Sequence, residues 1–252
     1  MLTTQRKELL LTRLAAEGQI VAKSLSQELG LSEDTIRRDL RELAQEGKLL
    51  RVHGGALPAS AAVGDMEIRQ QIAPADKLAL GRAGALLVKP GQLVILDGGT
   101  TALQVARHLP DNLRATIVTH SPTVALELAK HPNLEIIMLG GKLFRHSMVN
   151  VGAAVIEAAS RLSADLYFMG VTGVHLEAGL STGDYEEAAV KRALHERAAE
   201  TVVLASHEKL GAASKFSIAP LNEIATLVVP PQTPAKKVKA FMEAGPKVVV
   251  AA

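Results

Sequence analysis

Apolar residues recur at helical spacing through the first 45 residues of the chain. The spacing predicts helices over residues 4–16, 22–29 and 33–45. Gly18, Gly30 and Gly47 follow these stretches, as glycines commonly do at the C-terminal ends of helices. Ser32 stands where a residue capping the third helix is expected. The N-terminal part is therefore predicted to be a small three-helix unit.

A short hairpin is predicted after the third helix, and a linker after the hairpin. Residues 48–52 alternate weakly between polar and apolar, and Gly54 and Gly55 supply a turn. Residues 58–64 are small and are expected to be flexible. These patterns divide the chain into a winged helix-turn-helix over residues 1–58, a linker over 59–73 and a second domain over 74–252.

The second domain alternates short aliphatic runs with amphipathic stretches. Strands are predicted over residues 93–96, 116–119, 134–139, 165–169, 201–205, 225–229 and 247–250. Helices are predicted over residues 102–109, 122–130, 151–160, 185–199 and 235–243. This alternation indicates an α/β domain with a mostly parallel sheet covered by helices.

Composition narrows the class of protein. Hydrophobic residues make up 48% of the 252 residues, which excludes wholesale disorder. The chain has no cysteine, which excludes disulfides, thiolate zinc sites and a cysteine nucleophile. The histidines lack metal-ligand spacing, and no metal or cofactor is expected. With no secretory signal and no apolar run of about 20 residues, we expect a soluble, cytoplasmic protein without membrane contact.

The third helix has a face suited to DNA. On a helical wheel Ile36, Leu40 and Leu43 fall on one side, and Arg38 and Arg41 on the other. An apolar face packed on two helices and an arginine-bearing face toward solvent suit a recognition helix in the major groove. The alternative from the wheel alone is an ordinary helical bundle with a solvated charged face. The net charge of +2 permits nucleic-acid binding without demanding it.

A glycine-rich loop in the second domain is suited to phosphate. Asp97-Gly98-Gly99-Thr100-Thr101 follows a predicted strand and opens a predicted helix. Glycines allow close approach of a ligand to the backbone, and a helix N-terminus presents free N–H groups. The alternative is that these glycines only make the turn tight. Polar or glycine loops also follow the next three predicted strands, at residues 119–121, 140–142 and 170–173, and such loops meet at one edge of a parallel sheet.

Two sets of motifs resemble the DeoR/GlpR family of bacterial regulators. In the N-terminal part they are Thr35-Ile36-Arg37-Arg38-Asp39-Leu40 and His53-Gly54-Gly55-Ala56. The resemblance implies that Thr35, Arg37 and Arg38 face DNA. Together with the wheel and the wing, it gives a predicted DNA-binding set of Ser32, Thr35, Arg37, Arg38, Arg41, Arg51 and His53. Asp39 falls near the buried stripe and is expected to be an internal partner for an arginine.

The resemblance continues through the second domain. The matching segments are residues 97–101, 119–121, 140–141, 170–173, 179–182, 187–192 and 209–211. It implies a fold similar to ribose-5-phosphate isomerase and sugar-phosphate deaminases, and a sugar-phosphate effector. The predicted effector-binding set is Asp97, Gly98, Gly99, Thr100, Thr101, Thr119, His120, Ser121, Gly141, Lys142, Gly173 and Lys209. Lys191 and Arg192 are predicted to lie on a solvated helix face, with contact to the ligand as the alternative.

The chain departs from the family pattern at three places. Ser206-His207-Glu208 precedes Lys209 where the family usually carries Asp-x-Ser. The strand near residue 229 runs into Pro230, and His120 stands where Asn is common. His207 or Glu208 is a candidate substitute for the missing acid.

These observations predict a DNA-binding repressor of carbohydrate metabolism genes. A phosphorylated sugar or related metabolite would relieve its binding to a double-stranded operator, and the protein would be a homodimer or homotetramer without catalytic residues. The alternative is an active sugar-phosphate isomerase that carries a DNA-binding module. The missing acid before Lys209 argues against that alternative, because isomerisation needs a carboxylate base.

Overall fold

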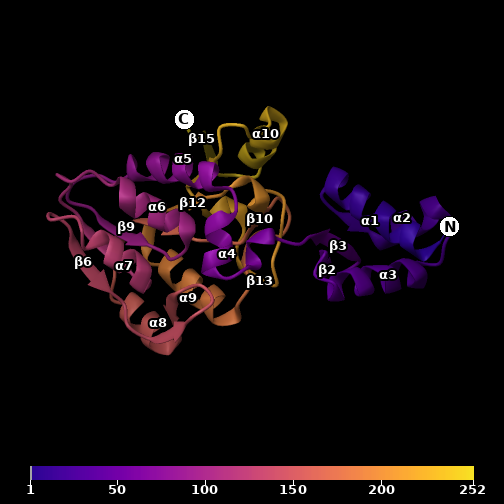
Figure 1. Cartoon of the computed structure of the whole chain (residues 1–252), viewed down its shortest axis with the longest axis horizontal. Coiled ribbons are helices and arrows are strands. Elements are labelled where there is room, and N and C mark those ends of the chain that lie inside the picture. The colour runs from indigo at the N-terminus through magenta and orange to yellow at the C-terminus, as the bar shows by residue number, and fades with distance from the viewer. Residues whose placement is uncertain (1) are drawn as a thin grey trace.

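The N-terminal domain has three helices and a three-stranded sheet. The computed structural model describes residues 2–252. Its first elements are α1 (Thr3–Glu17), β1 (Ile20–Val21), α2 (Ala22–Leu29), α3 (Glu33–Gln45), β2 (Leu49–Val52) and β3 (Gly55–Pro58). The predicted helices and hairpin are confirmed, and β1 adds a strand to the hairpin in the order β1-β3-β2. Figure 1 shows this domain set apart at one end of the molecule.

The fold of this domain follows from its apolar stripes. Leu10, Ile36, Leu40 and Leu43 are buried together between the helices. The Ser32 hydroxyl accepts a hydrogen bond from the Thr35 N–H and caps α3, as expected. The capped helix is thereby held with one face in the core and the opposite face in solvent.

Asp39 is the internal partner for an arginine that the sequence predicts. The Arg6 guanidinium of α1 donates to both carboxylate oxygens of Asp39 on α3, and both side chains are buried. A bidentate pair of this kind fixes the two helices relative to one another as well as holding them together.

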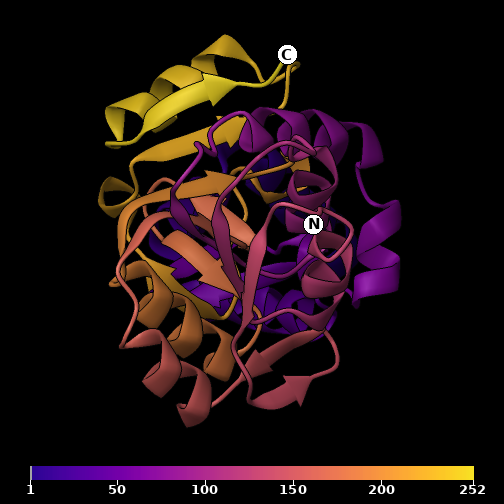
Figure 2. The same cartoon turned by 90° about the vertical axis from the view of Figure 1, so that its left-hand side faces the viewer.

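A seven-stranded parallel sheet forms the centre of the second domain. Its strands, in spatial order, are β15 (Lys247–Val250), β14 (Thr226–Val229), β12 (Ala198–Leu204), β9 (Ala164–Met169), β4 (Leu93–Leu96), β5 (Thr116–Thr119) and β6 (Glu135–Met138). Every neighbouring pair is parallel. These are the seven predicted strands, so the predicted parallel α/β architecture is confirmed. Figure 2 shows β15 and the helix before it at one edge of the sheet.

Helices cover both faces of the sheet, and alternate strand residues pack into two separate cores. One face is covered by α5 (Pro74–Ala85), α6 (Thr100–His108) and α7 (Pro122–Leu128), the other by α8 (Ala153–Ala159), α9 (Tyr185–His195) and α10 (Ala235–Glu243). In β4, Val94 and Leu96 join the first core and Ile95 joins the second. This alternation is the two-residue period of a strand buried on both sides.

Several short elements have no counterpart in the prediction. They are the hairpin of β7 (Lys142–Phe144) and β8 (Val149–Val151), the antiparallel sheet of β10 (Gly173–His175), β11 (Gly179–Thr182) and β13 (Phe216–Ala219), and the 3-10 turns η2 (His207–Lys209) and η3 (Leu221–Glu223). The helix predicted over residues 151–160 begins only at Ala153, because Val151 pairs with Lys142 in the hairpin. Strands of three or four residues are too short to show a period of two.

The expectation that residues 58–64 are flexible needs correction. The segment that follows the wing contains the 3-10 turn η1 (Ala61–Val63) and α4 (Met66–Gln71). Ser60 and Ala62 are buried, and the Ser60 hydroxyl donates to the Thr172 carbonyl. The small side chains of this segment allow it to pack closely against the second domain, so they do not make it flexible. Within residues 2–252, no helix has both the length and the apolar character that crossing a membrane requires.

Candidate functional site

A pocket opens at the carboxyl ends of β4 and β9. β4 ends at Leu96, and Asp97-Gly98-Gly99 turns the chain into α6. Gly99 has φ +102°, which side chains rarely adopt, and a Cβ on Gly98 would lie 2.2 Å from Cγ1 of Val149. Both glycines are therefore required for this turn, which leaves the N-terminus of α6 open to the pocket. Residues 98–102 form one wall of that pocket.

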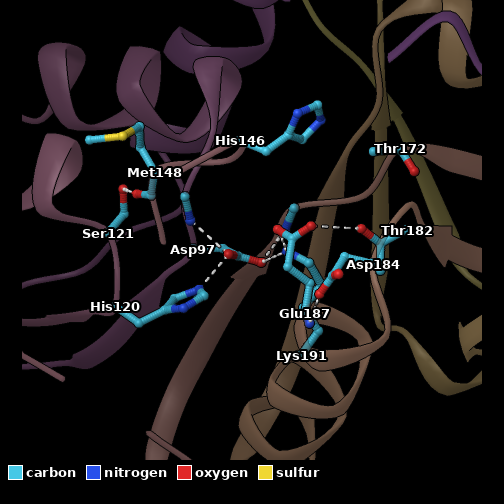
Figure 3. A network of polar contacts seen from close by, with 12 residues as sticks. Asp97, His120, Ser121, His146, Met148, Thr172, Thr182, Asp184, Glu187 and Lys191 are labelled. Atoms are coloured by element: carbon cyan, nitrogen blue, oxygen red, sulfur yellow. Dashed lines mark hydrogen bonds and ion pairs between the residues drawn. The ribbon is translucent and has the colours of Figure 1, made fainter. Parts of the chain in front are cut away.

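Asp97 is the centre of a buried hydrogen-bond network beneath the pocket floor (Figure 3). Its Oδ1 accepts from the Gly98 N–H at 2.7 Å and from Nε2 of His120 at 2.7 Å. Its Oδ2 accepts from the Tyr167 hydroxyl at 2.9 Å, the Gly170 N–H at 2.8 Å and Nζ of Lys191 at 2.7 Å. Five donors, from β9, the loops after β4, β5 and β9, and the helix α9, thus converge on one carboxylate.

The network keeps Asp97 ionised. Burial alone would raise the pKa of Asp97, but the charge of Lys191 and the hydrogen bond from His120 outweigh it and hold that pKa well below its usual range. Burial and the neighbouring carboxylate raise the pKa of Tyr167 well above its usual value. Lys191 is only 4% exposed, so its predicted place on a solvated face is wrong. Its ammonium is held inward because Asp97 supplies a buried counter-charge.

Both ring nitrogens of His120 lie within hydrogen-bond distance of an oxygen atom. Nδ1 lies 2.7 Å from the carbonyl oxygen of Asn150, and Nε2 lies 2.7 Å from Oδ1 of Asp97. This histidine, a departure from the family pattern, thereby connects the Asp97 carboxylate to the backbone at Asn150.

The pocket collects positive charge from elements far apart in the chain. Arg69 of α4, Lys77 of α5, Lys191 of α9 and Lys209 of η2 all line it. Burial and, to a smaller extent, the neighbouring cations lower the pKa of Lys209 to about 8, against the opposing influence of Glu208. Burial also lowers the pKa of Lys77. Glu187 and Glu208 line the same pocket, so four cations face two carboxylates there. An excess of positive charge beside a helix N-terminus is a lining that suits an anion.

The predicted effector residues fall into three groups. Gly98, Gly99, Thr100, Thr101 and Lys209 line the pocket. Asp97 and His120 form the network below it, and Thr119 and Ser121 are buried beside that network, where the Ser121 N–H donates to the Thr119 hydroxyl. Gly141, Lys142 and Gly173 lie outside the pocket.

The three outlying residues have structural surroundings of their own. Lys142 is exposed and forms an ion pair with Glu186. A Cβ on Gly141 would come within 2.8 Å of the Val151 carbonyl oxygen, and one on Gly173 within 2.6 Å of the Ala212 carbonyl oxygen. The two glycines therefore allow close backbone packing, and none of the three contributes to the pocket.

The pocket also contains residues that the sequence did not single out for ligand binding. Arg69 and Lys77 stand outside the strand-end loops, so no local pattern marks them. Glu187 and Lys191 belong to the motif at residues 187–192, which carried a usable signal. The Asp184 carboxylate caps α9 by accepting a hydrogen bond from the Glu187 N–H and so fixes the start of the helix that carries both residues (Figure 3).

A second candidate interface lies on the N-terminal domain. Arg37, Arg38 and Arg41 are exposed on α3, and Arg51 and His53 are exposed on the wing. A shallow groove between α3 and the wing is lined by Arg37, Arg51 and His53. Arg37 is paired with Glu33 at 2.7 Å, whereas no carboxylate among residues 2–252 lies within 4.0 Å of Arg38 or Arg41. These cations are available to phosphates and base edges.

Comparisons with known proteins assign both parts of the chain. Residues 6–61 match the family described as DeoR-like helix-turn-helix domain, and residues 72–230 match the DeoR C terminal sensor domain. The chain is 35% identical over 229 residues to the HTH-type transcriptional regulator GlpR of Haloferax volcanii, covering 89% of this chain and 88% of that protein. It is 33% identical over 230 residues to the HTH-type transcriptional repressor GlcR of Bacillus subtilis, covering 90% and 88%.

Among solved structures, the ribose 5-phosphate isomerase of Methanocaldococcus jannaschii matches 54% of each chain with a TM-score of 0.40 and 20% identity. The sequence relationships extend over nearly the whole chain and include both domains. The chain therefore belongs to the DeoR family of DNA-binding transcriptional regulators.

Proposed function

We propose that the pocket of the sensor domain binds a phosphorylated sugar or a related phosphate ester, and that this binding relieves repression of carbohydrate genes. The main observation behind the proposal is that four cationic side chains and the N-terminus of α6 line the same pocket. A phosphate group matches such a site in charge and in its demand for N–H donors.

The phosphate is proposed to lie over residues 98–101. The first N–H groups of α6 are free of intrahelical partners, and the Thr101 hydroxyl is buried without a hydrogen-bond partner within residues 2–252. Lys209 and Arg69 face the same space. Asp97 is fully occupied by its five donors, so it positions Lys191 rather than serving as a free base. This favours a role in binding over turnover.

Segment 59–73 offers a route from the pocket to the DNA-binding domain. A second cleft lies between the domains and is lined by Gln45 and Leu49 on one side and by His146 and Lys215 on the other. Ala62, Arg69, Ser147, Thr172 and Glu187 line both cavities. We propose that an anion held by Arg69 shifts the balance between two settings of this segment and so the orientation of the winged domains in a homo-oligomer.

Phosphate esters are expected to raise the melting temperature of the protein, and their unphosphorylated parent sugars are not. A ligand that binds only the native state stabilises it by mass action, about 2.7 kcal/mol at one hundred times the dissociation constant. Thermal unfolding against paired phosphorylated and unphosphorylated sugars measures this directly. A panel without any shift would contradict the proposed effector class while leaving the family assignment in place.

Binding of phosphate esters is expected to weaken as the pH rises from 7 to 9. With a pKa of about 8, Lys209 loses its charge over this interval, while a phosphate monoester, whose second pKa is about 6, keeps its own. If only the charged lysine binds, affinity falls about tenfold. Calorimetric titrations at several pH values measure the fall, and K209R, which stays charged, should flatten the profile. A fall of equal size in K209R would show that Lys209 is not its source.

A further inference from the structure

Two polar atoms in the effector pocket have no hydrogen-bond partner. Across residues 2–252, three buried side-chain atoms lack one, and two of these belong to pocket residues: Oγ1 of Thr101 and Oε2 of Glu208. A buried polar atom without a partner costs about 1–3 kcal/mol, so such atoms are rare unless a ligand or water completes them. Because both unpartnered atoms belong to the same pocket, they indicate where polar groups of its ligand would lie.

The surroundings of Glu208 keep its carboxylate in place but leave one oxygen unused. Oε1 accepts a hydrogen bond from the Ser206 hydroxyl at 2.6 Å. The charge of Glu208 opposes the lowering of the pKa values of Lys77 and Lys209, which places it among the pocket cations. Yet no Lys, Arg or His nitrogen among residues 2–252 lies close enough to the Glu208 carboxylate, within 4.0 Å, to form an ion pair. Oε2 is therefore a hydrogen-bond acceptor that is held in place but has no donor in the free protein.

We propose that Oε2 of Glu208 accepts a hydrogen bond from a hydroxyl of the effector, and that Thr101 donates to its phosphate. The proposal rests on the proposed function and makes it narrower. The effector class becomes a phosphate ester with a free hydroxyl, as against inorganic phosphate or an ester with an apolar tail. Glu208 stands where the family usually carries Ser, so this subsite belongs to the chain's own departures from the family pattern.

A hydroxyl fits this position better than a cation does. An ammonium group would meet Lys77 and Lys209, which line the same pocket. A divalent metal is the other candidate, because ligand atoms of Asp76, His207 and Glu208 lie within 4.8 Å of one another. However, Oδ2 of Asp76 already accepts from the backbone N–H of His207 at 3.0 Å and lies 2.8 Å from its Nδ1. A hydroxyl can donate a hydrogen bond to Oε2 without adding positive charge beside Lys77 and Lys209.

The test compares esters with and without hydroxyls in the wild type and in E208Q. Dissociation constants are measured for inorganic phosphate, ethyl phosphate, glycerol 3-phosphate and ribose 5-phosphate, with and without EDTA. We expect the wild type to prefer a hydroxylated ester over ethyl phosphate, and E208Q to lose about tenfold of that preference, because a hydrogen bond to a charged group is lost. E208Q removes a negative charge from the pocket and should therefore bind all anions more tightly. The ratio of the dissociation constants for ethyl phosphate and the hydroxylated ester cancels this general gain. E186Q, which changes an exposed carboxylate outside the pocket, is the matched control and should keep the ratio.

Each result decides the proposal. An unchanged preference in E208Q, or no preference in the wild type, overturns it while the phosphate site stands. Binding that EDTA abolishes shows that Oε2 serves a metal instead, and also overturns it. If none of the four probes binds the wild type, the proposed function itself fails. Oε2 has no hydrogen-bond partner to lose in the free protein, so a fall in the melting temperature of unliganded E208Q would come from the lost charge beside Lys77 and Lys209.

Discussion

Replacing Asp97 with alanine is expected to lower the free energy of unfolding of the sensor domain by about 4 kcal/mol, as for other broken buried ion pairs. The change leaves the buried Lys191 ammonium without its counter-charge and removes the acceptor for His120, Tyr167 and Gly170. Tyrosine fluorescence during urea unfolding measures the loss in this domain alone, because the chain has no Trp and both tyrosines, Tyr167 and Tyr185, lie here.

D165A provides the matched control for this substitution. Asp165 is an exposed carboxylate on β9 that accepts one backbone hydrogen bond, from the Leu93 N–H at 2.8 Å. Its removal should cost less than about 1 kcal/mol, the usual size of an exposed interaction. Equal losses in the two variants would show that the Asp97 network contributes nothing beyond an ordinary surface contact.

The stabilisation from Asp97 has a defined pH dependence. The folded-state pKa of Asp97 lies well below that of the unfolded chain, which is about 3.9. Its contribution is therefore fully present above that unfolded-state pKa and declines as the pH falls below it. A neutral D97N variant should lose this part of the acid sensitivity, so the stabilities of the two proteins should converge as the pH falls from 4 toward 2.

The sheet was predictable because its strands are buried on both faces. A run such as residues 93–96 is wholly aliphatic, and its sides enter two different cores, so it stands out from its polar surroundings. In the β7–β8 hairpin, β7 is largely exposed and β8 is a buried run of only three residues, so neither strand has a pattern of its own. Local pattern therefore identified the sheet and most of its covering helices, and it missed α5 (Pro74–Ala85) as well as the short elements.

The candidate site was predictable only where its residues adjoin a strand end. The loop at residues 97–101 has its own signature, whereas Lys191 lies within a helix, where a wheel assigns a charged residue to the solvent side. Its buried position depends on Asp97, which is 94 residues away in the chain. Arg69 reaches the pocket from a segment expected to be a linker. Such long-range pairing of charges leaves no trace in local periodicity.

Replacing Arg38 with alanine is expected to reduce affinity for the operator about a hundredfold or more, with helical content unchanged. Arg38 is exposed on the face of α3 opposite the buried Ile36 and Leu40, so its loss removes no core contact. A base contact by arginine contributes about 1–3 kcal/mol of discrimination, and in the proposed dimer the loss counts twice. The operator selected by the wild type from a random library serves as the probe in fluorescence anisotropy and footprinting.

Arg37 provides the comparison that separates a base contact from general charge. Its guanidinium is already paired with Glu33, and it lies on the flank of α3 beside the wing, so we expect R37A to weaken binding to all DNA sequences modestly and to reduce the salt dependence. R38A should instead abolish the distinction between operator and unrelated DNA while keeping much of the non-specific affinity. An unchanged footprint with R38A would remove Arg38 from the interface. Equal losses on both kinds of DNA would assign it to phosphate alone, and sequence readout would then fall to the remaining side chains of α3 and the wing.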